Sequence, residues 1–220
     1  MSYSQEDVLG ATRNLKGETI PVHIEIDAEQ VVLSQPEMRE LLAEAETIAV
    51  GTCVCREEEG NCDKPRDVCL SLDAEACQKI ADRGWRKIEF DEAMGILDET
   101  YRHGLVHMAY RRVAHEGDEL REGPISYVCS CCTCCCWPLN GLRQYDYHDA
   151  IAESAYVARY DESACVACGM CVDRCPFDAF AIPEGADRAV YTESRCFGCG
   201  LCIETCPSAA IRLSPRTAGD

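Results

Sequence analysis

Residues 165–176 read Cys-Val-Ala-Cys-Gly-Met-Cys-Val-Asp-Arg-Cys-Pro, and residues 196–207 read Cys-Phe-Gly-Cys-Gly-Leu-Cys-Ile-Glu-Thr-Cys-Pro. The four cysteines, one glycine and the final proline recur at an offset of 31 residues. A tyrosine, a glutamate and a serine upstream of each stretch recur at the same offset. The C-terminal part of the chain therefore contains a duplicated unit of about 25–30 residues.

The spacing of these cysteines suits a cubane iron–sulfur cluster, which needs thiolates at the four corners of a tetrahedron. Three cysteines at this spacing can wrap one tight loop around three corners, and the fourth thiolate must come from elsewhere. In two-cluster proteins with this pattern, the fourth cysteine of each run binds the other cluster. The expected ligands are Cys165, Cys168, Cys171 and Cys206 for cluster I, and Cys196, Cys199, Cys202 and Cys175 for cluster II.

Residues 156–214 resemble the bacterial-type two-cluster ferredoxins. The resemblance implies a pseudo-twofold ββ/α fold, two 4Fe–4S clusters and one-electron transfer at low potential. Two structural zinc sites of four cysteines each are the alternative, but zinc ligands usually come as C-x2-C pairs separated by a longer gap. Gly169 and Gly200 should let the backbone approach each cluster closely, and Pro176 and Pro207 should end the helical turn after each loop.

Eleven of the nineteen cysteines lie before this segment. Ten of them fall into two groups, which we interpret as a tentative additional metal centre: Cys53, Cys55, Cys62 and Cys69, and Cys129, Cys131, Cys132, Cys134, Cys135 and Cys136. One or more further iron–sulfur clusters are favoured, since lasting disulfides are rare in a reducing compartment. A zinc site, a redox-active dithiol or persulfide, and inert buried thiols remain alternatives. The eleventh, Cys77, is expected in the core because it has helical spacing with Ile80 and Ala81.

No cluster motif can be derived from the spacing of these ten cysteines. This part of the chain faintly resembles uncharacterised ferredoxin-fused proteins of anaerobes, and that resemblance implies no activity. Trp137 is expected to cover an apolar site, His103 and His107 to be surface or core histidines, and Glu57–Glu59 to form a solvated loop.

The coarse pattern predicts an α+β fold with two domains. Residues 1–150 should form a small cysteine-rich α+β domain, and residues 151–220 a ferredoxin-like domain, with the boundary near residues 145–155. Within the first domain we expect strands over 22–26, 105–109 and 125–128, helices beginning after Ser34 and spanning 73–83 and 91–103, and a polar loop over 115–124. Asp73 should cap its helix, and Gly84 and Gly104 should end theirs.

The chain carries a net charge of −18. Phosphate-binding surfaces need Lys and Arg, so nucleic acid and anionic membranes are poor partners. An acidic surface favours redox proteins with a basic patch. The sequence contains no run of about 18 apolar residues, so no membrane span is expected. The first residues show no secretory signal. We therefore expect a cytoplasmic location, and the oligomeric state stays open.

Three functions follow from the sequence. The first is an electron-transfer protein that passes single low-potential electrons between a donor and a redox enzyme, without catalysis of its own. The second is a reductase or an electron-input subunit whose N-terminal cysteine-rich centre is the active site. The third is a zinc- or thiol-based binding or sensing protein. The sequence contains neither a P-loop nor a G-x-G-x-x-G run, so nucleotide binding has no support.

Overall fold

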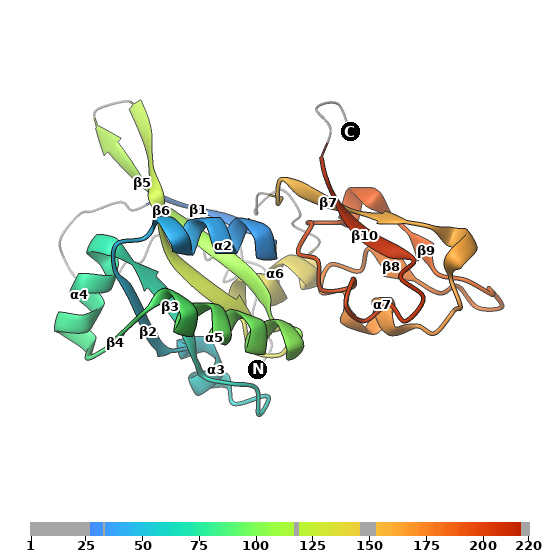
Figure 1. Cartoon of the computed structure of the whole chain (residues 1–220), viewed down its shortest axis with the longest axis horizontal. Helices are drawn as coiled ribbons and strands as arrows, with labels where there is room; N and C mark the ends of the chain where they lie inside the picture. Colours follow the sequence, from blue (N-terminus) through green and yellow to red (C-terminus); the bar gives the residue numbers. More distant parts are fainter. Residues whose placement is uncertain (1–26, 33, 117–118, 146–152, 217–220) are drawn as a thin grey trace.

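The computed structural model describes residues 27–32, 34–116, 119–145 and 153–216. The fold is mixed α/β, with one six-stranded sheet in the N-terminal part and two two-stranded sheets in the C-terminal part (Figure 1). The strand expected over 22–26 lies outside the described residues. None of the helices in the described ranges combines the length and the apolar composition needed to cross a bilayer.

The six-stranded sheet is antiparallel between all neighbouring strands. In spatial order, its strands are β1 (Asp27–Val32), β5 (Val106–Glu116), β6 (Glu119–Cys131), β3 (Asp67–Leu72), β2 (Ile48–Thr52) and β4 (Arg86–Ile88). The helices of this part are α2 (Gln35–Glu44), α3 (Val54–Glu59), α4 (Asp73–Arg83), α5 (Phe90–Arg102) and α6 (Trp137–Tyr145).

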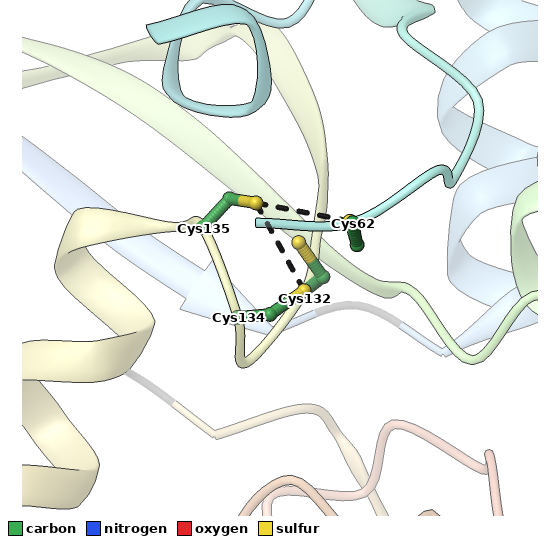
Figure 2. Close-up of side chains that lie close together, drawn as sticks. All are labelled: Cys62, Cys132, Cys134 and Cys135. Carbon is green, nitrogen blue, oxygen red and sulfur yellow. Dashed lines mark hydrogen bonds between the residues drawn. The ribbon is translucent and has the colours of Figure 1, made fainter. Parts of the chain in front are cut away.

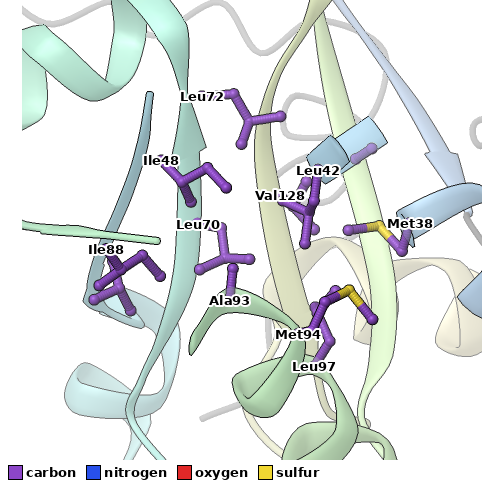
Figure 3. Close-up of a cluster of buried hydrophobic side chains, with 12 residues drawn as sticks. Met38, Leu42, Ile48, Leu70, Leu72, Ile88, Ala93, Met94, Leu97 and Val128 are labelled. Carbon is purple, nitrogen blue, oxygen red and sulfur yellow. The ribbon is translucent and has the colours of Figure 1, made fainter. Parts of the chain in front are cut away.

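One face of the sheet is covered by α2 and α5. Their apolar side chains interdigitate with those of β2, β3, β4, β5 and β6 to form the main core (Figure 3). Its buried members are Met38, Leu42, Ile48, Val50, Leu70, Leu72, Ile88, Ala93, Met94, Leu97, Ala109 and Val128. Because side chains alternate along a strand, Cys69 and Ser71 of β3 face the other side.

Helix α4 lies over that second face. The Lys79 ammonium sits 5.7 Å from the ring centroids of both Trp85 and Tyr127. Gly51 leaves room for this arrangement, since a Cβ at this position would lie 2.1 Å from the Trp85 ring. Cys77 is exposed, so its expected place in the core is wrong. It stands one position, or about 100°, around α4 from the fully buried Ala76, outside the apolar stripe.

Two further expectations need correction. The polar segment 115–124 is part of the β5–β6 hairpin rather than a loop, with His115 paired to Leu120 and Glu116 to Glu119. Backbone pairing continues past the core there, and polar composition does not prevent it. Asp73 is the first residue of α4 rather than its N-cap, and its carboxylate instead accepts hydrogen bonds from the backbone N–H groups of Glu46 and Thr47 at 2.8 and 3.2 Å.

The C-terminal part consists of short elements around the two cysteine runs. They are β7 (Tyr156–Tyr160) paired with β10 (Ile211–Pro215), β8 (Phe180–Ala181) paired with β9 (Val190–Tyr191), α7 (Met170–Arg174), and 3-10 turns at Glu162–Ala164 and Glu193–Arg195. Positive φ angles recur at the 31-residue offset: Ala167 and Gly198, Gly169 and Gly200, Asp178 and Ala209. The local backbone thus follows the sequence repeat at these positions.

The two parts of the chain are in direct contact. The Glu37 carboxylate of α2 accepts hydrogen bonds from the Ser154 hydroxyl at 2.6 Å and from the Ala155 N–H at 3.0 Å. The Tyr101 hydroxyl of α5 donates to the carbonyl of Gly200 in the second cysteine run. The Arg174 guanidinium donates back to the Tyr101 carbonyl at 2.5 Å. The N-terminal and C-terminal parts of the chain therefore share an interface.

Candidate metal centres

A first cavity lies inside the loop of residues 165–171. Cys165, Cys168 and Cys171 line it from the first run, and Cys206 lines it from the second. Ala189 and Ala210 complete the wall. These are the four residues expected for cluster I. The chain folds so that the distant Cys206 closes the side of the cavity that the loop leaves open.

A second cavity repeats this arrangement with the runs exchanged. Cys196, Cys199 and Cys202 line it from the second run, and Cys175 arrives from the first. Aromatic rings of Phe177, Phe180 and Phe197 complete the wall. The expected grouping for cluster II is therefore present in space as well as in the sequence.

Backbone N–H groups point at several of these sulfurs. Ala179 donates to Cys175 Sγ and Ala210 to Cys206 Sγ, both at 3.3 Å, and Ala167 donates to Cys165 Sγ at 3.4 Å. Such donors stabilise anionic sulfur and tune the potential of an iron–sulfur cluster. Four thiols around one small cavity, with amide donors aimed at the sulfurs, fit a 4Fe–4S cluster.

The two cavities differ in exposure. Around the first, Cys168 is exposed, Val166 is 62% exposed and Met170 is 46% exposed. A hydrogen bond from Tyr160 lowers the pKa of Cys165 there. Around the second, burial raises the pKa of Cys199 well above its ordinary value, so this thiol needs a bound cation to ionise. The first cavity faces solvent, and the second faces the N-terminal part.

A comparison with protein families recognises this region. Residues 164–210 match the 4Fe-4S dicluster domain. The match includes all eight cysteines of the two cavities and does not cover residues 1–163. It supports iron–sulfur cluster binding and a ferredoxin-type role in electron transfer. A comparison with curated proteins finds no match for the chain.

The N-terminal part holds a separate four-thiol site. The Sγ atoms of Cys62, Cys132, Cys134 and Cys135 all lie within 4.8 Å of one another (Figure 2). Cys62 comes from the loop between α3 and β3, and the other three come from the turn between β6 and α6. The Asn61 side chain holds the two segments together by donating to the Cys134 carbonyl at 2.9 Å. Sites of four cysteine thiolates bind zinc, iron or an iron–sulfur cluster.

Arg56 of α3 lies beside this site and is fully buried. It donates to the Ser130 carbonyl at 2.6 Å and to the Pro65 carbonyl, while its Nε has no partner among the described residues. Burial opposes ionisation of Cys132, but hydrogen bonds from Arg56 and Cys134 outweigh it and lower the Cys132 pKa to about 7. A buried guanidinium next to thiols fits an anionic metal–thiolate centre. The sequence places this arginine directly after Cys55, which was the one available signal for its role.

The remaining six candidate cysteines do not join the four-thiol site. Cys53, Cys55, Cys69 and Cys129 pack together with Val68, Trp85 and Tyr127. Cys131 and Cys136 belong to the apolar cluster that joins the two parts of the chain. Each of the two sets in the structure, the four-thiol site and the remaining six cysteines, therefore contains members of both sequence groups.

Three other expectations can now be placed. Trp137 is 40% exposed and its indole donates to Glu59 at 2.9 Å, so it does not serve as the expected apolar cover. Residues Glu57 and Glu58 are exposed as expected, although they belong to α3 rather than to a loop. His107 is buried beside the Thr100 hydroxyl, 3.1 Å away, and desolvation lowers its pKa to about 4. Its burial and its contact with Thr100 place His107 in the interior of the fold.

Proposed function

We propose that this protein carries single electrons through two 4Fe–4S clusters in its C-terminal part and delivers them to a metal–thiolate centre in its N-terminal part. The observation that carries the proposal is the exchange of fourth ligands. Each cavity takes three cysteines from one run and one from the other, which is the arrangement that two-cluster ferredoxins use.

The chain would contribute binding, insulation and tuning. Eight thiolates would hold the clusters, which supply reversible one-electron chemistry when bound. Amide donors at Cys165, Cys175 and Cys206 stabilise negative charge on sulfur. Burial of the second cavity by Phe177, Phe197 and Leu201 excludes water from that side.

The partner would be a redox protein with a basic surface, in the cytoplasm. The net charge of −18 supports electrostatic steering toward such a surface. The solvent-facing loop of the first cavity is the proposed entry point, since Cys168 is the most accessible of the cluster cysteines. Raising the ionic strength should therefore slow reduction by a basic donor protein and leave reduction by a small neutral reductant unchanged.

Electron paramagnetic resonance on anaerobically prepared protein tests the proposal. After reduction with dithionite, we expect the signals of two magnetically interacting 4Fe–4S clusters. The Cys206→Ser and Cys175→Ser variants should each remove one cluster and convert the remaining signal to that of an isolated centre. Reduced protein without any cluster signal, or with zinc in both cavities, would exclude electron transfer by this segment.

A second candidate function is that of a reductase or its electron-input subunit. The four-thiol site favours it, because Cys62 and Cys134 are only partly buried and could admit a small molecule. If this site is catalytic, a small thiol or cyanide should change its absorption or resonance spectrum. If one zinc ion occupies it instead, the protein's N-terminal part is better described as a structural or sensing module.

A further inference from the structure

Six cysteines outside both the ferredoxin-type segment and the four-thiol site lie on adjoining elements. Cys53 and Cys55 stand at the start of α3, Cys69 lies on β3, Cys129 and Cys131 lie on β6, and Cys136 precedes α6. The register of the sheet explains part of this gathering. Leu70 pairs with Val128, so Cys69 and Cys129 are neighbours on the opposite face of the sheet.

These residues form one continuous series of packed side chains. Cys53, Cys55, Cys69 and Cys129 pack together, and Cys129 also packs against the cluster that contains Cys131 and Cys136. Cys129 therefore joins the two sets, and the six cysteines adjoin one region of the interior.

This region is distinct from the four-thiol site. Cys132 and Cys135 pack against Leu105, Cys62 and Cys134 in a separate apolar cluster. The six-thiol group instead packs with Trp85, Tyr110 and Tyr127. Arg56 lies close to both, because it follows Cys55 in the chain and its guanidinium donates to the carbonyl of Ser130, between Cys129 and Cys132 in the sequence.

The number of thiols limits what they can hold. A single zinc or iron ion takes four thiolates, so six converging thiols exceed the needs of one ion. Tyr127 also packs against this group. Six uncoordinated thiols in mutual contact would have no evident role in packing that aliphatic residues could not perform better.

We propose that Cys53, Cys55, Cys69, Cys129, Cys131 and Cys136 hold one polynuclear iron–sulfur centre, separate from the four-thiol site, and that this centre exchanges electrons with cluster II. The second half of this inference rests on the proposed function. The first half, the existence of the centre, does not.

The path to cluster II is a single packed cluster of side chains. Cys131 and Cys136 share it with Phe177, Phe197 and Leu201, and the cluster II ligands Cys175 and Cys199 pack against the same group. The rings of Phe177 and Phe197 are stacked with centroids 4.4 Å apart. The Tyr101 hydroxyl further ties the N-terminal part to the Gly200 carbonyl in the cluster II loop. In the transfer, reduced cluster II loses one electron and the six-thiol centre gains it, with no proton or bond exchanged.

Metal analysis of two double variants and one single variant, all of full length, tests the existence of the centre. Protein would be reconstituted anaerobically with ferrous iron and sulfide, and iron, sulfide and spectra measured per chain. Cys129→Ser/Cys131→Ser should lose the iron of the six-thiol centre and keep both ferredoxin-type clusters and the four-thiol metal. Cys132→Ser/Cys135→Ser should show the reverse loss. Cys77→Ser, an exposed cysteine outside both groups, should lose nothing.

Two results would overturn the assignment. If both double variants lose the same metal, the ten cysteines form one centre. If Cys129→Ser/Cys131→Ser loses no metal, the six thiols bind none. Should that variant fail to fold by circular dichroism, Cys55→Ser replaces it, because Cys55 is only partly buried on a short helix and still belongs to the series.

The electron link has its own test. In wild-type protein, brief photoreduction followed by rapid freezing should show cluster II and the six-thiol centre reduced in succession. In Cys175→Ser, which keeps all six thiols, that succession should be lost. Reduction of the six-thiol centre at an unchanged rate in this variant would exclude cluster II as its donor. Absence of the ferredoxin-type clusters would instead defeat the proposed function and leave the iron count of the six-thiol centre standing.

Discussion

The C-terminal cavities and the six-thiol group collect their thiols in opposite ways. In each C-terminal cavity, three ligands come from one loop of seven residues, and only the fourth is distant. The four-thiol site follows the same plan, with three thiols from one turn and Cys62 from a distant loop. The six-thiol group instead needs the sheet to form first: Cys69 and Cys129 are 60 residues apart in the sequence and become neighbours through the strand register.

The difference shows which sites a spacing pattern can report. A loop that wraps a cluster leaves a fixed interval between its cysteines, and the interval is visible in the sequence. A site formed by strand pairing leaves no interval, because its geometry depends on register and on the alternation of side chains. The adjacent Cys131 and Cys132 accordingly enter two different groups.

The largest loss of iron should follow from replacing either of the two distant cluster ligands, Cys206 or Cys175, with serine. Cys206→Ser, although it lies in the second run, should remove the cluster held by the first run and about four irons. Cys175→Ser should remove the other cluster. Iron analysis and resonance spectra of the separate variants measure this. Loss of the cluster belonging to the mutated run would contradict the crossed arrangement.

Gly198, in the second cysteine run, and Gly185, between the two runs, offer a matched pair. A Cβ on Gly198 would lie 1.9 Å from the Tyr156 carbonyl oxygen, whereas one on Gly185 would meet nothing within 4 Å. Both have positive φ, so alanine at either position costs about 1–2 kcal/mol in backbone strain. Only Gly198→Ala should also displace β7 and impair assembly of cluster II, as measured by iron content and thermal unfolding. Equal behaviour of the two variants would show that the crowding at Gly198 is relieved without consequence.

His107 makes the stability of the N-terminal sheet depend on pH. Its pKa is about 4 in the folded state because of desolvation, below the ordinary value near 6.5. The unfolded state therefore takes up a proton first as the pH falls, and stability present above pH 6.5 is lost toward pH 4. Between pH 7 and pH 5 this amounts to about 2 kcal/mol.

Urea unfolding at the two pH values measures this loss. His107→Gln keeps a polar partner for Thr100 but cannot be protonated, and it should be less sensitive to pH by the same amount. An unchanged pH dependence in the variant would assign the loss to other groups.

The smallest effect is expected at Cys77. The exposed thiol lies outside every cavity and thiol group described above, so Cys77→Ser should change the free energy of unfolding by less than about 0.5 kcal/mol. Metal content and spectra should equal those of the wild type. A loss of metal in this variant would mean that thiol replacement acts indirectly, and the other cysteine variants would need reinterpretation.

Much of the N-terminal secondary structure follows from local signals. Helices α2 and α4 begin and end close to where Ser34, Pro36 and Gly84 indicate. The hairpin over 115–124 could not be predicted from local signals. Its composition is typical of a turn, and composition does not show whether a partner strand lies alongside. The prediction for Cys77 was wrong for a related reason. Helical spacing shows which residues share a face, but the structure shows which face is buried, and that face contains Ala76.

The eight cysteines of the C-terminal cavities could be grouped from spacing together with the rule of the exchanged fourth ligand. The ten in the N-terminal part could be identified as candidates but not grouped. Tyr127, which packs with the thiols there, could not be connected with them, and the only signal for Arg56 was its place directly after Cys55. Their roles depend on where α3 packs and which face of β6 is presented, and these are properties of the assembled sheet.

Iron, acid-labile sulfide and zinc per chain in anaerobically prepared wild-type protein test the central claim most directly. Two ferredoxin-type clusters alone give about eight irons and eight sulfides. We predict a clear excess over eight irons, with matching sulfide, because the N-terminal thiols hold iron as well. Eight irons or fewer, with zinc or with no metal in the N-terminal part, would contradict the claim that electrons pass from one part of the chain to the other.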